Sequence, residues 1–196
     1  MSTQPHIVGI GGTTRPGSST EKAIRFALAA CEERGATTRL LAGHAIAMLP
    51  PYAPENPERT PDAIALVDEL RRADGLVIGS PGYHGTVSGL VKNALDYTED
   101  MRDDPLPYFS ERPVGLIATG AGWQGVVTTL ETLRSIVHAL RGWPTPLGAA
   151  INTSVPVFGP DDHVVDERVR FQLTTIAHDV VAFASWRLRA KTSAHG

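Results

Sequence analysis

The segment between residues 11 and 20 gathers glycines, hydroxyl groups and one arginine directly before a helical pattern. It reads Gly11-Gly12-Thr13-Thr14-Arg15-Pro16-Gly17-Ser18-Ser19-Thr20. Glycines let the backbone turn tightly and direct successive N–H groups inward, and the start of the following helix adds a partial positive charge. The hydroxyl groups and Arg15 supply further donors. This composition predicts a phosphate cradle, and its many hydroxyls favour a terminal monoester over a pyrophosphate.

Two other nucleotide-binding loops are disfavoured by the same residues. A P-loop ends in Gly-Lys-Ser/Thr, whereas the first lysine of this chain is Lys22. A dinucleotide fingerprint needs a third glycine where Thr14 stands, and the predicted second strand ends without a carboxylate for a ribose. A plain helix cap stays open, because Ser18 and Glu21 fit the capping-box pattern. A cap leaves the Gly-Gly pair, the other hydroxyls and Arg15 unexplained.

Two later loops also carry unusual residues. The second extends from Ser80 to Tyr97 and contains prolines, glycines, Tyr83 and His84. The third, Thr119–Gly125, is rich in glycine, which lets the backbone approach a planar ligand closely. A tight turn that leads into a helix is the alternative interpretation of the third loop.

Five apolar segments between these loops are predicted strands: His6–Gly11, Thr37–Ala42, Gly75–Ser80, Pro113–Ala118 and Pro146–Ile151. Segments with helical periodicity alternate with them. These predicted helices cover Ala23–Glu33, the region of Ile64–Leu70, Ser88–Tyr97, Gln124–Leu140 and Val169–Phe183. The proline-rich stretch Pro50–Pro61 is expected to be a long surface loop.

The alternation of strands and helices predicts an α/β fold with three layers and helices on both faces of the sheet. Five strands favour a flavodoxin-like parallel sheet of order 2-1-3-4-5. Ligands of such sheets bind beyond the carboxyl ends of the strands, where the three unusual loops follow strands one, three and four. We expect a single domain over residues 1–190 and a disordered tail over 191–196.

The first two loops resemble long motifs of the NADPH-dependent FMN reductase family. Residues 12–20 resemble its G-S-x-R-x-x-S-x-N motif, and residues 81–97 resemble its P-x-Y-x-G-x-x-x-G-x-x-K-N-x-x-D-[WY] signature. The third loop looks like the family's [ST]-[TG]-G-x-x-G loop. The similarity extends from Ile7 to about Ala150, and the form is similar to reductase components of two-component monooxygenases. Many relatives have Glu at Gly82 and Asn at His84, so the polar contacts at the ring edge differ here.

The resemblance implies an FMN site built from all three loops. The residues that it assigns to the phosphate are Thr13, Arg15, Ser18, Ser19 and Thr20. Those assigned to the edge of the isoalloxazine ring are Pro81, Gly82, Tyr83, His84 and Gly85. Those assigned to its pyrimidine side are Thr119, Gly120, Ala121 and Gly122. Trp123 is expected either to cover the ring or to lie in a subunit interface.

The implied chemistry is hydride transfer from NADPH or NADH to FMN, with NADPH favoured by the family. Because the hydride passes directly between the two rings, we expect no catalytic side chain. The seven histidines show no ligand spacing, so we expect no metal site. Pro50–Pro61 and Met101–Phe109 are the expected walls for the nicotinamide nucleotide, and Arg59 and Arg102 are the candidates for contact with a 2′-phosphate.

Three functions are open at this point. The first is an NAD(P)H-dependent FMN reductase that supplies reduced flavin to a partner monooxygenase. The second is an enzyme that retains FMN and reduces quinones, azo dyes or metal oxyanions. The third is a flavodoxin-type electron carrier, which is disfavoured because carriers are usually strongly acidic and the net charge is only −3.

Composition and segment patterns restrict location and partners. A net charge of −3 argues against nucleic acid as a partner, and no apolar run is long enough for a membrane span. The absence of a signal-like N-terminus and a single cysteine, Cys31, favour the cytoplasm. Cys31 is expected to be a small buried residue. The resemblance implies a homodimer or homotetramer with each flavin near a subunit boundary.

Overall fold

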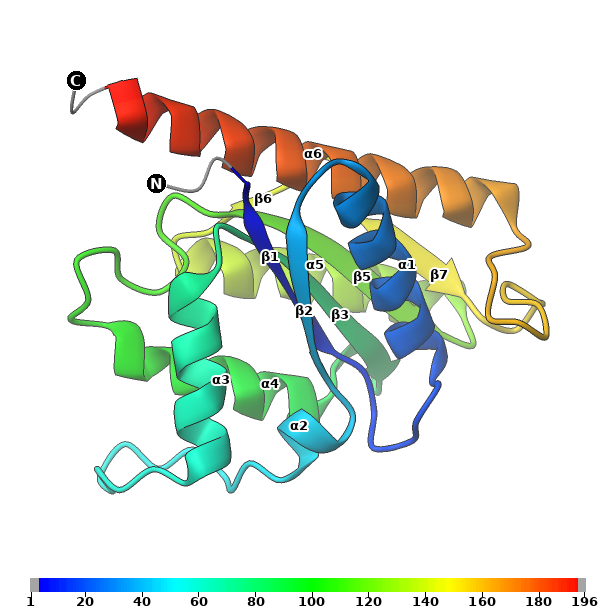
Figure 1. Ribbon diagram of the computed structural model, residues 1–196. Helices are drawn as coiled ribbons and strands as arrows, with labels where there is room; N and C mark the ends of the chain where they lie inside the picture. Colours follow the sequence, from blue (N-terminus) through cyan, green and yellow to red (C-terminus); the bar gives the residue numbers. More distant parts are fainter. Residues whose placement is uncertain (1–3, 194–196) are drawn as a thin grey trace.

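The computed structural model describes residues 4–193, and in it a twisted, mostly parallel sheet lies between two layers of helices (Figure 1). The strands are β1 (His6–Gly11), β2 (Thr37–Ala42), β3 (Gly75–Tyr83), β4 (Thr86–Val87), β5 (Pro113–Gly120), β6 (Trp143–Pro144) and β7 (Ala149–Asn152). The helices are α1 (Ser19–Glu33), α2 (His44–Ala47), α3 (Pro61–Arg72), α4 (Gly89–Asp96), α5 (Trp123–Ala139) and α6 (Glu167–Ser193), with a 3₁₀ helix, η1 (Tyr97–Met101), after α4.

The flavodoxin-like order predicted from the sequence is confirmed for the four long strands, which lie in the order β2-β1-β3-β5. The strand count differs from five, because the position beyond β5 is shared by β6 and β7, both parallel to β5. Pro144 and Pro146 have no N–H for a ladder, which explains why pairing stops after β6 and resumes only at Ala149. The two-residue strand β4 turns back antiparallel to the end of β3.

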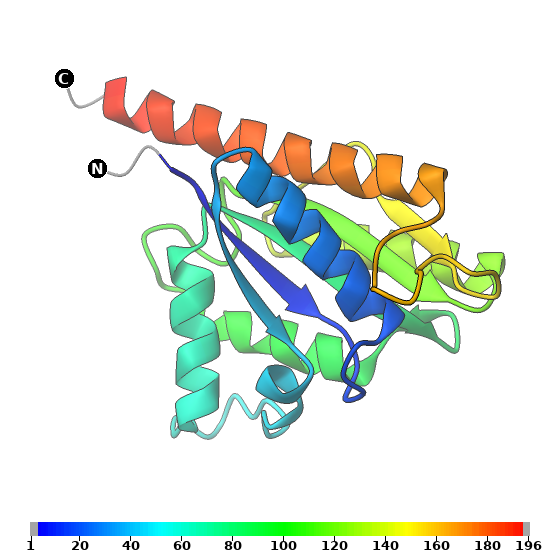
Figure 2. The ribbon, with the colours of Figure 1, turned by 45° about the vertical axis from the view of Figure 1, so that its right-hand side comes forward.

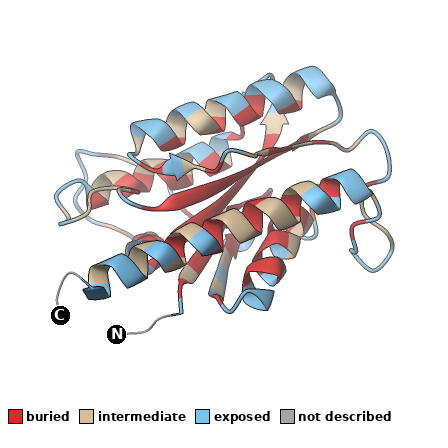
Figure 3. Cartoon of the chain, turned by 90° about the horizontal axis from the view of Figure 1, so that it is seen from above, coloured by how far each residue is buried: buried red, intermediate tan, exposed pale blue. Residues whose placement is uncertain are grey.

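Alternate residues of the central strands face the two helix layers. Val8 and Ile10 of β1 pack with α3, α4 and α5, whereas Ile7 packs with α1 and α6. Figure 2 shows α1 and α6 together on one side of the sheet, and Figure 3 shows the buried sheet between exposed helix faces. A sheet covered on both faces explains the continuous apolar runs in its strands.

Helix α6 extends further than the sequence suggested. We expected the chain to leave the fold near residue 190, but α6 continues to Ser193, so residues 191–193 are a correction to the predicted tail. Arg187 anchors this end of α6 through ion pairs with Asp74 (3.4 Å) and Glu111 (3.2 Å). Residues 194–196 lie outside the described residues. None of the helices in the described part of the chain is long and apolar enough to cross a membrane.

Strands β1 and β3 come unusually close at their carboxyl ends. Gly11 has a φ of +138°, and a β-carbon at this position would lie 1.8 Å from the carbonyl oxygen of Gly79. The N–H of the next residue, Gly12, donates to the same carbonyl over 3.3 Å. Only glycine permits this approach, and the contact sets the direction in which the chain leaves β1.

Replacing Gly11 with alanine is expected to destabilise the fold by about 3 kcal/mol, through the forced separation of β1 from β3 and the positive φ. Urea denaturation of Gly11→Ala measures this loss as a lower midpoint. Gly89→Ala is the matched control, because a β-carbon at Gly89 meets nothing within 4 Å. Equal midpoints for the two variants would contradict the role assigned to the contact.

Candidate functional site

Three loops meet at the carboxyl edge of the sheet. They follow β1, β3 and β5, which are neighbours in the sheet, so their first residues are adjacent (Figure 1). Gly11 is in register with Gly79, and Pro81 is in register with Thr119. The topology therefore brings together the three segments that the sequence analysis assigned to one site.

The loop after β1 ends in a capped helix. The Ser18 hydroxyl accepts from the N–H of Glu21 over 3.3 Å, so Ser18 is the N-cap of α1, as the capping alternative predicted. Thr13 is half-buried, and its hydroxyl accepts from the N–H of Arg15 over 3.1 Å, which shapes the turn before the helix.

The loop leaves several donors free. Within residues 4–193, the N–H groups of Ser19 and Thr20 have no acceptor, and the exposed guanidinium of Arg15 has no hydrogen-bond or ion-pair partner. Unpaired N–H groups at a helix start, together with a free cation, fit the terminal phosphate of a mononucleotide.

Glu21, in the first turn of α1, contacts the loop in a way that the capping-box pattern does not predict. Its carboxylate accepts from the N–H of Gly17 over 3.3 Å and pairs with Arg25 over 2.6 Å. A capping box would place the glutamate on the N–H of Ser18, so the observed geometry is shifted by one residue toward the loop. The Gly17 N–H is therefore already used by the carboxylate and is not free for a ligand.

A buried hydroxyl pair ties the first and third loops together. The Thr20 and Thr119 hydroxyl oxygens lie 2.6 Å apart, and both residues are buried. Each hydroxyl thus has one partner inside the protein. The pair fixes the start of α1 to the end of β5.

The second loop is a tight turn with its tip in solvent. Pro81 is buried and Gly82 is half-buried, whereas Tyr83, His84 and Gly85 are exposed. His84 and Gly85 both have positive φ values, +52° and +83°. A groove of about 360 Å³ separates this turn from the start of α5, and its lining residues are His84, Gly85, Gln124, Gly125 and Thr128.

The glycine at position 82 has a steric explanation. A β-carbon there would lie 2.7 Å from the Thr129 hydroxyl oxygen and 3.1 Å from the Gly125 carbonyl oxygen. The Thr129 hydroxyl lies 2.7 Å from the same carbonyl and 3.2 Å from the carbonyl oxygen of Thr86. Thr129 on α5 therefore takes the space that a larger residue at position 82 needs.

The third loop leads directly into α5. Thr119 is buried and Gly120 is half-buried, while Ala121 and Gly122 are exposed. The Gly120 carbonyl accepts from the N–H of Thr153 over 2.8 Å, which joins this loop to the segment after β7. Trp123, the first residue of α5, is 56% exposed.

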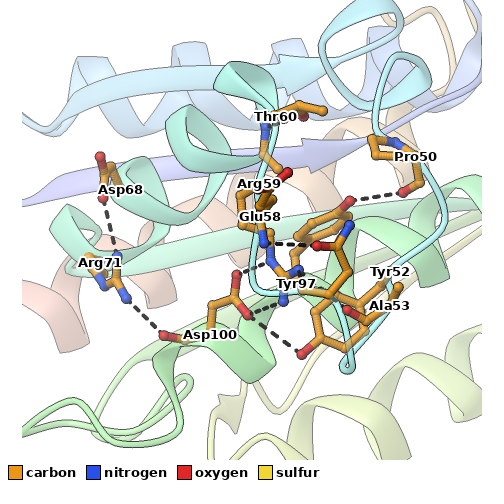
Figure 4. Close-up of polar contacts among 12 residues, drawn as sticks. Pro50, Tyr52, Ala53, Glu58, Arg59, Thr60, Asp68, Arg71, Tyr97 and Asp100 are labelled. Atoms are coloured by element: carbon orange, nitrogen blue, oxygen red, sulfur yellow. Dashed lines mark hydrogen bonds and ion pairs between the residues drawn. The ribbon is translucent and has the colours of Figure 1, made fainter.

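Arg59 does not have the role that the sequence suggested. Its guanidinium donates to both carboxylate oxygens of Asp100, over 2.7 and 2.8 Å, and is only 15% exposed (Figure 4). It also lies 4.9 Å from the ring centroid of Tyr52 and 5.8 Å from that of Tyr97. Arg59 therefore clamps the loop before α3 to η1, which corrects our expectation that it is free for a 2′-phosphate.

Two further ion pairs lie on the surface. Lys92 and Asp96 form an ion pair of 2.5 Å along α4, and Arg102 pairs with Glu99 over 3.2 Å. Cys31 is fully buried, as predicted, and burial, with a smaller effect of the Glu32 charge, raises its pKa to about 12. In the described ranges of the chain, no group of three or more His, Cys, Asp or Glu side chains is arranged to hold a metal ion.

The chain is similar to a protein family and to individual curated proteins. The model of the NADPH-dependent FMN reductase family matches residues 5–155. A curated FMN-dependent NADPH-azoreductase of Staphylococcus aureus is 38% identical over 91 residues, which are 45% of this chain and 44% of the relative. The match thus spans less than half the length of that relative.

Solved structures share the fold. FerB, a flavoenzyme NAD(P)H:(acceptor) oxidoreductase from Paracoccus denitrificans, has a TM-score of 0.72 and 22% identity, with 93% of this chain and 96% of FerB covered. The apo form of the NADH:FMN oxidoreductase EmoB has a TM-score of 0.67 and 23% identity, with 92% and 89% covered.

The Arg59–Asp100 clamp predicts a pH-dependent stability. Hydrogen bonding from Arg59 lowers the pKa of Asp100 in the folded protein. The ionised carboxylate therefore stabilises the fold above the pKa of Asp100 in the unfolded chain, about 3.9. This stabilisation is lost as the pH falls through the lower pKa of Asp100 in the folded protein. Asp100→Asn is expected to lower the melting temperature at pH 7, with a difference from the unchanged protein that narrows below about pH 4.

Thermal unfolding followed by circular dichroism between pH 7 and pH 2.5 measures this difference. Asp103→Asn is the control, because the Asp103 side chain is 90% exposed. A deficit in Asp100→Asn that stays constant over the whole pH range would exclude the charged clamp.

Proposed function

The chain belongs to the NADPH-dependent FMN reductase family, and on that premise we propose that it is an NAD(P)H-dependent oxidoreductase that binds FMN at the three loops. The observation that carries the proposal is the loop after β1, whose free N–H groups at Ser19 and Thr20 and free guanidinium at Arg15 suit a phosphate monoester. The family description names both FMN and NADPH.

In this proposal each loop has a separate task. Arg15, Thr13 and the start of α1, from Ser18 to Thr20, hold the phosphate. Pro81–Gly85 lie along one edge of the flavin ring, and Thr119–Gly122 present backbone to its pyrimidine side. Backbone N–H groups on that side stabilise negative charge on the ring.

Bound FMN would supply the ring that accepts a hydride from the reduced nicotinamide. The protein then has to hold the two rings in contact and needs no side chain as acid, base or nucleophile. The exposed Tyr83 and Trp123 and the groove beside His84 provide the surface on which the second substrate lies. We propose NADPH, or alternatively NADH, as that donor.

The acceptor divides the proposal into two forms. In the first, reduced FMN leaves the protein and supplies a partner monooxygenase. In the second, FMN stays bound and the protein reduces azo dyes, quinones or metal oxyanions. The azoreductase of Staphylococcus aureus, which is 38% identical over 91 residues of the chain, favours this second form.

We also propose a homodimer or homotetramer in the cytoplasm. Exposed Trp143 and Trp186 both pack edge-to-face against Phe183 beside β6, an aromatic surface suited to association. A single, buried cysteine agrees with a reducing compartment. Light scattering tests the assembly, and a mass near 20.9 kDa at micromolar concentration would contradict it.

Anaerobic mixing tests the activity. The FMN-reconstituted protein should lose its flavin absorbance on addition of NADPH, NADH or both. Steady-state rates with free FMN and with a quinone as competing acceptors then separate the two forms. Absence of bleaching by either nucleotide would exclude the enzyme and leave an electron carrier.

Arg15→Ala is expected to weaken FMN binding about tenfold, because one charge-assisted hydrogen bond to the phosphate contributes on the order of 1.4 kcal/mol. The exposed position predicts intact folding. Fluorescence titration with FMN measures the change, with Arg168→Ala on exposed α6 surface as the control. Equal affinities in the two variants would remove Arg15 from the site.

A further inference from the structure

Glu21 places a carboxylate against the loop that the proposed function assigns to the flavin phosphate. The residue is only 7% exposed, and its carboxylate accepts from the Gly17 N–H over 3.3 Å. Its β-carbon lies close to the loop backbone, because a β-carbon added to Gly12 would be 3.7 Å from it. The charge is therefore fixed next to the loop rather than mobile in solvent.

The nearby cations are largely neutralised. Arg25 pairs with Glu21 over 2.6 Å. Lys22 pairs with Asp162 over 2.6 Å, in the segment before α6, and lies 5.9 Å from the Phe158 ring centroid. Of the three cations in this part of the described chain, Arg15 alone has no ion-pair partner.

A phosphate at this loop meets both an attraction and a repulsion. The start of α1 and Arg15 attract the dianion. Glu21 pairs with Arg25 through one carboxylate oxygen and holds the other oxygen on the Gly17 N–H, where it repels the dianion and uses that donor. We propose that Glu21 lowers the affinity of the loop for the flavin phosphate and so makes FMN an exchangeable substrate. This inference rests on the proposed function and argues for its first form, in which reduced FMN leaves the protein, against the second form that the azoreductase match supports.

The same contacts keep the loop ordered without a ligand. The Gly17 N–H bonds to Glu21, the Glu21 N–H bonds to Ser18, and Thr20 bonds to Thr119. A loop that is folded in the absence of FMN loses little conformational entropy on binding and gains little order from it. Repeated binding and release therefore require no refolding of the site.

Glu21→Gln removes the negative charge and releases Arg25, while the glutamine carbonyl can still accept from the Gly17 N–H. Both changes make the loop more positive. Glu33→Gln is the matched control, at the exposed far end of the same helix. The probes are FMN and riboflavin, which differ only in the phosphate, and fluorescence titration gives their dissociation constants. We expect Glu21→Gln to bind FMN about tenfold more tightly and riboflavin unchanged, with Glu33→Gln equal to the unchanged protein for both.

Asp162→Asn is a second variant that does not depend on the helix start. It frees Lys22, and the 60% exposed side chain makes loss of folding unexpected. Tighter FMN binding by about threefold, without a change for riboflavin, supports the same charge argument. If Glu21→Gln fails to fold by circular dichroism, this variant still shows whether the charge around the loop sets its affinity for the flavin phosphate, and an unchanged FMN affinity would overturn the charge argument.

The outcomes separate the inference from the proposed function. Equal FMN affinity in the unchanged protein and both variants would overturn the role of Glu21 and leave FMN binding intact. Tightening of FMN and riboflavin alike would also overturn it, because the phosphate would not be involved. Nanomolar retention of FMN by the unchanged protein would contradict exchange. Failure of every variant to bind either flavin would overturn the proposed function itself.

Discussion

The contact between Gly11 and the Gly79 carbonyl is the constraint on which the site depends. Parallel strands covered on both faces send their loops to one edge, but adjacent loops meet only if the strand ends are close. The absence of a side chain on Gly11 lets β1 and β3 approach at this point, and the Gly12 N–H closes the contact. The Thr20–Thr119 pair then joins the third loop, so three sequence-distant segments form one surface.

Order and binding strength are separate properties of that surface. Ser18, Glu21 and Thr119 satisfy groups of the first loop from within the protein, which gives a folded loop before any ligand arrives. The Glu21 carboxylate among these partners also reduces the positive potential that a phosphate would meet. This combination is the basis on which we propose that FMN exchanges at the loop.

Sequence patterns predicted the elements that depend on local periodicity. Strands His6–Gly11 and Thr37–Ala42 were predicted with the bounds that the structure gives, because each apolar run is closed by a turn residue. Two features could not be predicted in this way: the sharing of the position beyond β5 by β6 and β7, and the length of α6. Both depend on contacts between residues that are distant in the sequence. Arg187 reaches Asp74, 113 positions away, and no local pattern signals such a pair. The same holds at the candidate site, where the first loop was predicted from its composition and the other motif residues from the resemblance, but the shifted Glu21 contact needed coordinates.

Arg59 and Glu21 contribute different properties to the candidate site: Arg59 gives rigidity, and Glu21 is proposed to weaken phosphate binding. Arg59 holds the loop before α3 against η1 with two hydrogen bonds to Asp100 and two aromatic neighbours, so this part of the structure is fixed (Figure 4). In the proposed function, such a fixed frame would help to keep two ring systems in the geometry that hydride transfer needs. The phosphate loop that we propose Glu21 weakens would then allow FMN to exchange without movement of that frame.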